Sequence, residues 1–348
     1  MESRYNLICR EVKEVINRRH LEKLLSDPSF VPKGYWGTAP TGRIHVGYLR
    51  PMFVIADLVS AGCEVTILLA DIHAFLDSRK SPLDNQLRTQ YYEIVITELL
   101  KLLEVDLSRV KFVVGSSFQE TREYTRDLLT IANSINCSVA KDAGTEVVKQ
   151  DSDPKLTSLL YPIMQVLDEK YLGADFELGG VDQRKIFAFG IDHIHRHTKH
   201  KITYLMNAMV QGLSGEKTSG GTTKMSSSST IGKLDLLDSP KELLNKIKKV
   251  YCLPGDIEDN TLLNLCKYIL FPLLGRLNKT MILKKKFEDV ELEVKNYVDL
   301  ENLFLNGLHP DDFKTSVAGA IGGVLKPLRD KFLEPEMIIL LKKAYGSG

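Results

Sequence analysis

Apolar runs and helical spacing alternate along the first half of the chain. Residues 65–70 form a continuous apolar run, which is typical of a strand buried on both faces of a parallel sheet. Further β-rich segments at 34–38 and 111–115 are expected to be strands as well. Between these segments, residues 45–60 and 86–104 are expected to be helices. This alternation predicts βαβ units and an α/β fold with a doubly wound parallel sheet.

The pattern changes at a Gly/Ser/Thr-rich stretch, residues 213–232, which is expected to be a mobile loop. Residues 239–242 then combine an N-cap serine, a proline at the first helical position and a capping-box glutamate. From there to the C-terminus the spacing is mainly helical, and no set of segments would build a sheet. We therefore expect two domains, an α/β domain over residues 1–230 and an α-helical domain over residues 231–348.

Composition narrows the class of protein without naming a function. Hydrophobic residues make up 43% and charged residues 26%, which excludes disordered and fibrous proteins. The formal net charge of +1 gives no global reason for a polyanion partner, although local basic patches can still bind nucleic acid. No apolar stretch approaches the ~20 residues needed to cross a bilayer, and the N-terminus lacks the features of a secretory signal. The five scattered cysteines predict neither disulfides nor thiolate zinc sites, so we expect a cytoplasmic protein without a membrane segment.

Two polar segments have the chemistry to bind a nucleotide. Residues 40–48 join a strand to a helix start, where backbone N–H groups and the helix dipole suit a phosphate chain. His45 can donate to phosphate oxygens there, and Gly47 allows a purine or ribose to approach the backbone closely. Lys224, in the Gly/Ser/Thr-rich stretch, can stabilise charge that develops on a triphosphate. Taken alone, the first segment is equally explained by an ordinary strand-to-helix turn, and the second is better explained by a solvated linker.

Together the two segments resemble the signature pair of class I aminoacyl-tRNA synthetases, a His-x-Gly helix start and a Lys-Met-Ser-Ser-Ser loop. Between them, residues 161–173 and 179–185 closely resemble the amino-acid-binding segment of tyrosyl-tRNA synthetases of the archaeal and eukaryotic cytosolic branch. Residues 68–75 and 308–312 resemble that branch too, so matching pieces extend over residues 35–329. The resemblance implies a Rossmann-like catalytic domain followed by a helical anticodon-binding domain.

The resemblance also implies a tyrosine-binding site. Tyr35 and Asp168 would bind the hydroxyl of tyrosine, and Tyr161, Gln165 and Gln183 would hold its amino-acid end. The spacing is compatible with this, because positions i, i+4 and i+7 of the segment that begins at Tyr161 share one helix face. An ordinary amphipathic helix would show the same spacing if the flanking matches were ignored.

The implied ATP site combines both signatures, with catalysis assigned to His45 and Lys224. Its members are Gly42, His45, Gly47, Lys224, Met225, Ser226, Ser227 and Ser228. Tyr48 stands where most class I enzymes have a second histidine, and Ser227 replaces a second lysine, as in the tyrosyl branch. Residues 216–223 make the segment before Lys224 longer than the family pattern predicts, which indicates a local insertion. ATP would be a substrate accompanied by Mg²⁺, and no protein-bound metal is expected.

The resemblance further implies contacts with tRNA(Tyr), and a homodimer. Arg184 falls in the portion that would meet the acceptor stem, while Phe287 and Asp312 would read the first anticodon base. An aromatic side chain with a carboxylate is a workable reader of an unpaired guanine. The alternative for Phe287 is a core residue beside a solvated run of charges at 284–286.

Four histidines between residues 193 and 200 invite a metal-site interpretation. Their i, i+2, i+4 and i+7 spacing does not fit standard zinc sites, and the interspersed Arg196, Lys199 and Lys201 would repel a cation. We predict a solvated helix end or loop.

The sequence therefore predicts tyrosine activation by ATP and transfer of tyrosine to the 3′ end of tRNA. A tryptophanyl-tRNA synthetase is the nearest alternative, because it shares the fold and both signatures, but Tyr35 with Asp168 favours a phenol. A nucleotidyltransferase outside the synthetases is disfavoured by the Lys224 loop and the helical domain. An inactive RNA-binding scaffold is disfavoured because both signatures and the tyrosine pocket are retained.

Overall fold

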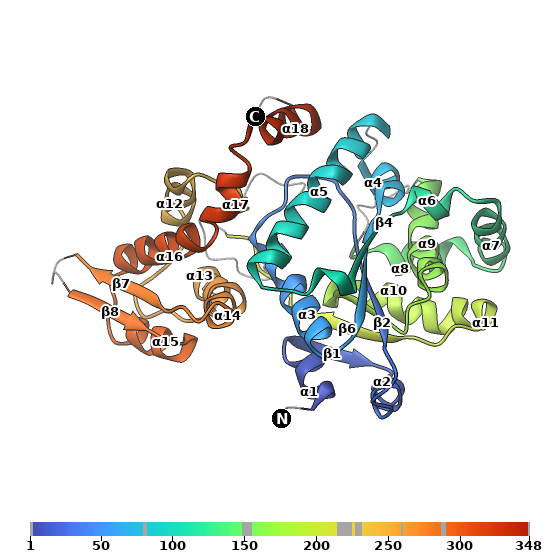
Figure 1. Ribbon diagram of the computed structural model, residues 1–348, viewed down its shortest axis with the longest axis horizontal. Helices are drawn as coiled ribbons and strands as arrows, with labels where there is room; N and C mark the ends of the chain where they lie inside the picture. The colour runs from blue at the N-terminus through green and yellow to red at the C-terminus, as the bar shows by residue number, and fades with distance from the viewer. Residues whose placement is uncertain are drawn as a thin grey trace. The chain divides into compact units, whose positions relative to one another are not determined.

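The computed structural model describes most of the chain, in two compact units (Figure 1). The described residues are 3–78, 82–147, 155–213, 225–226, 232–258, 260–286 and 290–346. One unit comprises Met1–Thr41 and Val54–Met209, and the other comprises Gly42–Phe53 and Val210–Gly348. The second unit thus takes in residues 42–53 and starts at 210, whereas the sequence suggested a boundary near 231. The assignment of catalysis to 1–230 and of anticodon binding to 231–348 stays a prediction.

A six-stranded sheet forms the centre of the first unit. Its strands, in spatial order, are β1 (Val12–Ile16), β6 (Thr203–Asn207), β5 (Phe176–Gly180), β2 (Lys33–Thr38), β3 (Glu64–Leu69) and β4 (Val110–Val114). The strands from β6 to β4 are parallel, and β1 pairs antiparallel with β6 at one edge. The predicted α/β class and the expected strands at 34–38, 65–70 and 111–115 are confirmed, whereas β1, β5 and β6 were not predicted.

Helices connect these strands, and the helix predicted over 86–104 is present as α5. The helices that contain described residues of this unit are α1 (Arg4–Cys9), α2 (Arg18–Leu25), α3 (Leu49–Ser60), α4 (Asp71–Ser78), α5 (Pro82–Leu102), α6 (Ser116–Gln119), α7 (Arg122–Ala132), α8 (Cys137–Gly144), α9 (Leu156–Leu172), α10 (Arg184–Phe189) and α11 (His195–Thr198). None of the helices in the described part of the chain is long and apolar enough to span a bilayer.

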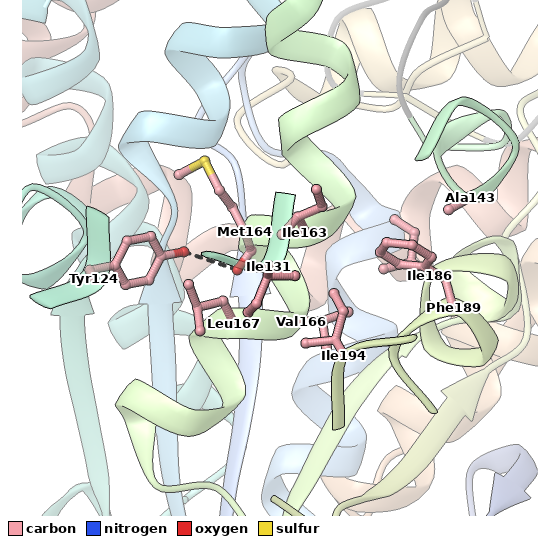
Figure 2. Close-up of a cluster of buried hydrophobic side chains, with 10 residues drawn as sticks. All are labelled: Tyr124, Ile131, Ala143, Ile163, Met164, Val166, Leu167, Ile186, Phe189 and Ile194. Atoms are coloured by element: carbon pink, nitrogen blue, oxygen red, sulfur yellow. Dashed lines mark hydrogen bonds between the residues drawn. The ribbon is translucent and has the colours of Figure 1, made fainter. Parts of the chain in front are cut away.

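Helix α9 positions the site that is described below. Helices α4, α7, α8 and α10 pack against it, and Gly173 ends it with a left-handed φ of 60°. Figure 2 shows one face of α9 in the hydrophobic core, where Ile163, Val166 and Leu167 lie among side chains of the neighbouring helices. Because this face is fixed by packing, the polar residues on another face of α9 are held in one orientation.

The second unit is mainly helical, as expected, but it also contains a β-hairpin. Its helices are α12 (Pro240–Lys248), α13 (Thr261–Leu265), α14 (Phe271–Arg276), α15 (Tyr297–Leu305), α16 (Pro310–Val324), α17 (Lys326–Lys331) and α18 (Pro335–Tyr345). The capping box predicted at 239–242 is present at the start of α12. The expectation of no strands here was wrong, because β7 (Met281–Lys285) and β8 (Val290–Val294) pair antiparallel. Met281 and Leu283 alternate with exposed residues and are buried where β7 packs on α16.

Candidate active site

A small cavity in the first unit lies near the carboxyl ends of the parallel strands, where α/β sheets bind ligands. Its lining residues are Tyr35, Gly37, Thr38, Ala39, Leu68, Ala70, His73, Tyr161, Gln165, Asp168, Glu177 and Gln183. All five residues that the resemblance implies for the tyrosine site are among them. The structure therefore brings together side chains from β2, α9 and the turn after β5.

Asp168 is the most enclosed acidic group in this cavity. It is 1% exposed, and Nε2 of Gln119 donates to both of its oxygens at 2.8 and 2.9 Å. The hydroxyl of Tyr124 donates to Oδ1 at 2.8 Å. Burial raises the pKa of Asp168 to about 8, although these two donors favour the carboxylate. His73 is not a counter-ion, because burial lowers its pKa to about 4 and leaves it neutral at pH 7.

Gln119, Tyr124 and His73 were not predicted as site residues. Gln119 lies on α6, which follows β4 directly, and His73 lies on α4, which follows β3. Polar residues just after parallel strands gather at one edge of the sheet, so their positions in the sequence carried a usable signal. Tyr124 lies on α7, further along the chain, and gave no such signal.

Tyr35 and Gln165 connect the sheet to α9. The hydroxyl of Tyr35, which is 1% exposed, donates to the backbone oxygen of Gln165 at 3.2 Å. The side-chain amide of Gln165 donates to Oε1 of Glu177 at 3.1 Å and to Oε1 of Gln183 at 2.9 Å. The ring of Tyr161 lies edge-on to that of His73, with centroids 4.6 Å apart. The cavity is thus lined by side chains whose orientations are fixed by hydrogen bonds and ring packing.

The histidine segment is partly buried, so the prediction of a solvated helix end is wrong for His195. Its Nε2 lies 2.8 Å from Oε2 of Glu169 and 3.1 Å from the hydroxyl of Tyr204, and burial lowers its pKa to about 4. His200 also packs inward, with Nε2 2.7 Å from the backbone oxygen of Ala174. Within the described ranges, no three His, Cys, Asp or Glu side chains are grouped to hold a metal ion.

The first signature lies in the second unit, at a short 3₁₀ turn that leads into α3. His45 is buried and caps this turn, and its Nδ1 accepts the backbone N–H of Gly47 at 3.2 Å. The neutral imidazole then carries its proton on Nε2, which makes that nitrogen a donor. A Cβ added to Gly47 would lie 2.8 Å from Cε1 of His45, so a glycine is needed to keep the ring in place. Tyr48 packs edge-on against His45, with ring centroids 5.0 Å apart.

Two residues of the second signature, Met225 and Ser226, are described, and they lie in the same unit. The backbone of His45 pairs with that of Asp235, and Met225 donates its N–H to the oxygen of Val210 at 3.0 Å. The oxygen of Gly42 accepts from the hydroxyl of Tyr345 at 3.1 Å. Ser226 is among the described residues, whereas Lys224, Ser227 and Ser228 lie outside them.

The residues implied for tRNA contacts are spread over both units. Arg184 begins α10, its side chain is 63% exposed, and it forms an ion pair with Glu14 at 2.8 Å. Asp312 lies in the first turn of α16, is 4% exposed, and accepts the backbone N–H of Lys286 at 3.3 Å. Phe287 lies outside the described residues.

Comparison with known proteins places the chain in a family. Residues 31–326 match the family of class I tRNA synthetases (W and Y). The chain is 44% identical to the cytoplasmic tyrosine–tRNA ligase of Xenopus tropicalis over 99% of its length, and spans 63% of that relative. It is 39% identical to the probable cytoplasmic tyrosine–tRNA ligase of Encephalitozoon cuniculi, with 99% of both chains covered. The chain thus spans less than two thirds of the vertebrate relative and nearly all of the shorter one.

A solved structure agrees with the sequence comparison. The tyrosyl-tRNA synthetase of Archaeoglobus fulgidus, crystallised with L-tyrosine, superposes with a TM-score of 0.82 at 32% identity. The superposition covers 94% of this chain and 98% of that one. The chain therefore belongs to the class I tRNA synthetases of the tryptophan and tyrosine group, as a member of the tyrosyl-tRNA synthetase family.

Proposed function

We propose that this chain is a cytoplasmic tyrosine–tRNA ligase, which activates L-tyrosine with ATP and transfers it to tRNA(Tyr). The names of the relatives support the reaction and the compartment. The observation that carries the choice of amino acid is the buried carboxyl group of Asp168, which lines one cavity with the hydroxyl of Tyr35. A phenol offers one O–H donor and one acceptor oxygen, which matches this pair.

The contacts in the cavity define how tyrosine would bind. The hydroxyl of Tyr35, which donates to the backbone oxygen of Gln165 in this structure, turns its O–H to the phenol oxygen of bound tyrosine. Asp168 accepts the phenol O–H of the substrate. Gln119 and Tyr124 hold the carboxyl group of Asp168 in place. At the other end of the substrate, Tyr161, Gln165 and Gln183 hold the amino-acid group.

Tyrosine activation requires no side-chain nucleophile. A carboxylate oxygen of tyrosine attacks the α-phosphorus of ATP, the bond between that phosphorus and the bridging oxygen breaks, and pyrophosphate leaves. His45 donates from Nε2 to phosphate oxygens, and the helix start that contains Gly42 and Gly47 adds backbone donors. Lys224, with Met225, Ser226, Ser227 and Ser228 in the same loop, stabilises the charge that develops on the leaving pyrophosphate. ATP binds as its magnesium complex, so Mg²⁺ arrives with the substrate.

Transfer follows when a terminal ribose hydroxyl of tRNA attacks the carbonyl carbon of tyrosyl-adenylate and releases AMP. Arg184 is proposed to contact the acceptor stem, which is consistent with its exposed position. Phe287 and Asp312 are proposed to read the first anticodon base. The proposal also includes a homodimer, for which sedimentation equilibrium of the purified chain is the direct test.

Tyrosine-dependent exchange between ATP and labelled pyrophosphate tests the proposed function. Purified protein is expected to catalyse exchange with tyrosine, and not with tryptophan or phenylalanine at the same concentration. Charging of a tRNA(Tyr) transcript then tests the second step. Exchange that depends on tryptophan would assign the chain to the tryptophanyl enzymes, and exchange with none of the three would refute the proposal.

A further inference from the structure

A buried carboxyl group, that of Glu177, lines the cavity and has no role in the reaction described above. It is 2% exposed, and the strand register pairs it with Tyr35 of β2 on one side and Tyr204 of β6 on the other. Paired residues on neighbouring strands point to the same face of a sheet, so these three side chains form a row. Helix α9 meets this row, because Gln165 bonds to Glu177 and Glu169 bonds to Tyr204.

The side-chain amide of Gln165 is the group that Glu177 holds. A primary amide has two N–H donors, and here Oε1 of Glu177 and Oε1 of Gln183 accept from it at 3.1 and 2.9 Å. The amide oxygen is therefore the part that Gln165 can offer to a ligand. A flip of the amide would break both hydrogen bonds and place its oxygen against two other acceptors.

An ammonium group has three N–H donors and no acceptor, so it binds an amide oxygen and is repelled by an amide N–H. On the basis of the proposed function, we infer that Glu177 is a positioning residue. It fixes the Gln165 amide with its oxygen toward the ammonium group of bound tyrosine.

The cost of burying Glu177 supports a role beyond packing. Its Oε2 is buried without a hydrogen-bond partner, and in the described part of the chain no Lys or Arg pairs with it or with Glu169. Burial, with the neighbouring charge of Glu169, raises the pKa of Glu177 well above its usual value. An apolar side chain of similar length would fill this position without that desolvation cost. We therefore expect the carboxyl group of Glu177 to be retained because it orients the side-chain amide of Gln165.

A ligand that lacks the ammonium group isolates this role. Tyrosine and 3-(4-hydroxyphenyl)propionate differ only in that group, and their affinities are measured by isothermal titration on the purified chain. Glu177→Met is expected to weaken tyrosine binding by about tenfold, the loss of one charge-assisted contact, and to leave the propionate within about twofold. In a Gln165→Met background, Glu177→Met is expected to change tyrosine affinity no further, because the amide that it positions is gone.

Glu177→Gln is the matched control, because it keeps an acceptor for Gln165 at nearly constant volume. It also tests the inference when Glu177→Met does not fold. It is expected to bind tyrosine within about threefold of wild type. The inference is overturned by equal weakening of both ligands in Glu177→Met, by additive losses in the double variant, or by a tenfold loss for either ligand in Glu177→Gln. If the wild-type chain does not bind tyrosine, the proposed function itself fails, which separates the two hypotheses.

Discussion

Replacing Asp168 by asparagine tests whether one carboxylate selects tyrosine. Oδ1 of Asp168 accepts from both Gln119 and Tyr124, whereas Oδ2 accepts from Gln119 alone and lies 4.0 Å from Nε2 of His73. An asparagine whose oxygen takes the place of Oδ1 keeps the two bonds to that atom. It replaces Oδ2 by an amide nitrogen, so the variant removes a charge and an acceptor with almost no change in volume.

The expected magnitude follows from the change in the hydrogen bond to the substrate. A hydrogen bond to a charged group contributes about 1.5–3 kcal/mol, and one between neutral groups contributes about 0.5–1.5 kcal/mol. Asp168→Asn should therefore cost about 1–2 kcal/mol, or roughly 5- to 30-fold in kcat/KM for tyrosine. Phenylalanine leaves Oδ2 in the wild type with Gln119 as its one hydrogen-bond donor, and an incompletely satisfied buried charge costs more than an incompletely satisfied amide. The ratio of tyrosine to phenylalanine activation should fall by about one to two orders of magnitude.

Pyrophosphate exchange with each amino acid, run above about pH 8 where Asp168 is ionised, measures this ratio in wild type and variant. Asp57→Asn is the matched control, because Asp57 is an equally buried aspartate on α3 that does not line the cavity. It should leave the ratio unchanged. An Asp168→Asn enzyme that still rejects phenylalanine as strongly as wild type would show that the phenol is recognised elsewhere.

Four other perturbations address the remaining parts of the protein. Gly47→Ala should reduce the kcat of exchange with normal tyrosine affinity, because the new Cβ displaces the ring of His45; normal kcat would show that the ring position is unimportant. Lys224→Ala should slow adenylate formation by about two orders of magnitude in rapid-quench experiments and spare tyrosine binding; an unchanged rate would remove the lysine from the mechanism. Phe287→Ala should raise the KM for tRNA by about tenfold and leave exchange unchanged; equal loss of both would indicate a core residue. The pKa of Asp168 is raised in the folded protein to about 8, so between about pH 4 and 8 the folded state holds a proton that the unfolded state has lost. The contribution of this proton to the free energy of unfolding is fully present below pH 4 and is lost as the pH rises through 8. Urea titrations should show that the free energy of unfolding falls less steeply with pH in Asp168→Asn, by up to about 1.4 kcal/mol per pH unit. Parallel pH profiles for wild type and variant would show that Asp168 does not titrate in this way.

Three strands of the sheet, β2, β3 and β4, were predictable from β-rich or apolar runs, but burial alone did not make a strand predictable, because the buried strands β5 and β6 were not predicted. The parallel strands β2 and β3 consist largely of buried residues, so they stand out as β-rich or apolar runs. Strand β1 contains Lys13 and Glu14 and is partly exposed, and it is defined by its pairing with β6, which is distant in the sequence. The hairpin of β7 and β8 alternates over only five residues in each strand, too few for its period to stand out from a helical background.

The site was predictable to the extent that it follows motifs and the face of a single helix. The spacing of Tyr161, Gln165 and Asp168 predicts a shared helix face, and the resemblance supplied Tyr35 and Gln183. Neither source shows which strands and helices come to face one another. Strand register and helix packing alone bring Gln119 to Asp168 and Glu177 to Gln165, so these supporting residues emerged only from the structure.

The supporting residues matter because the site holds three buried carboxyl groups on adjacent elements. Asp168, Glu169 and Glu177 are each no more than 2% exposed, and in the described chain no Lys or Arg forms an ion pair with them. Such groups destabilise a folded protein unless donors satisfy them. Asp168 accepts from Gln119 and Tyr124, and Glu169 accepts from Tyr204. Oε2 of Glu177 has no hydrogen-bond donor. Tyrosine would add a phenol O–H and a positive ammonium group to this region. The wild-type chain should therefore gain more thermal stability from tyrosine than from the ammonium-free propionate at equal saturation, and Glu177→Met should reduce that difference.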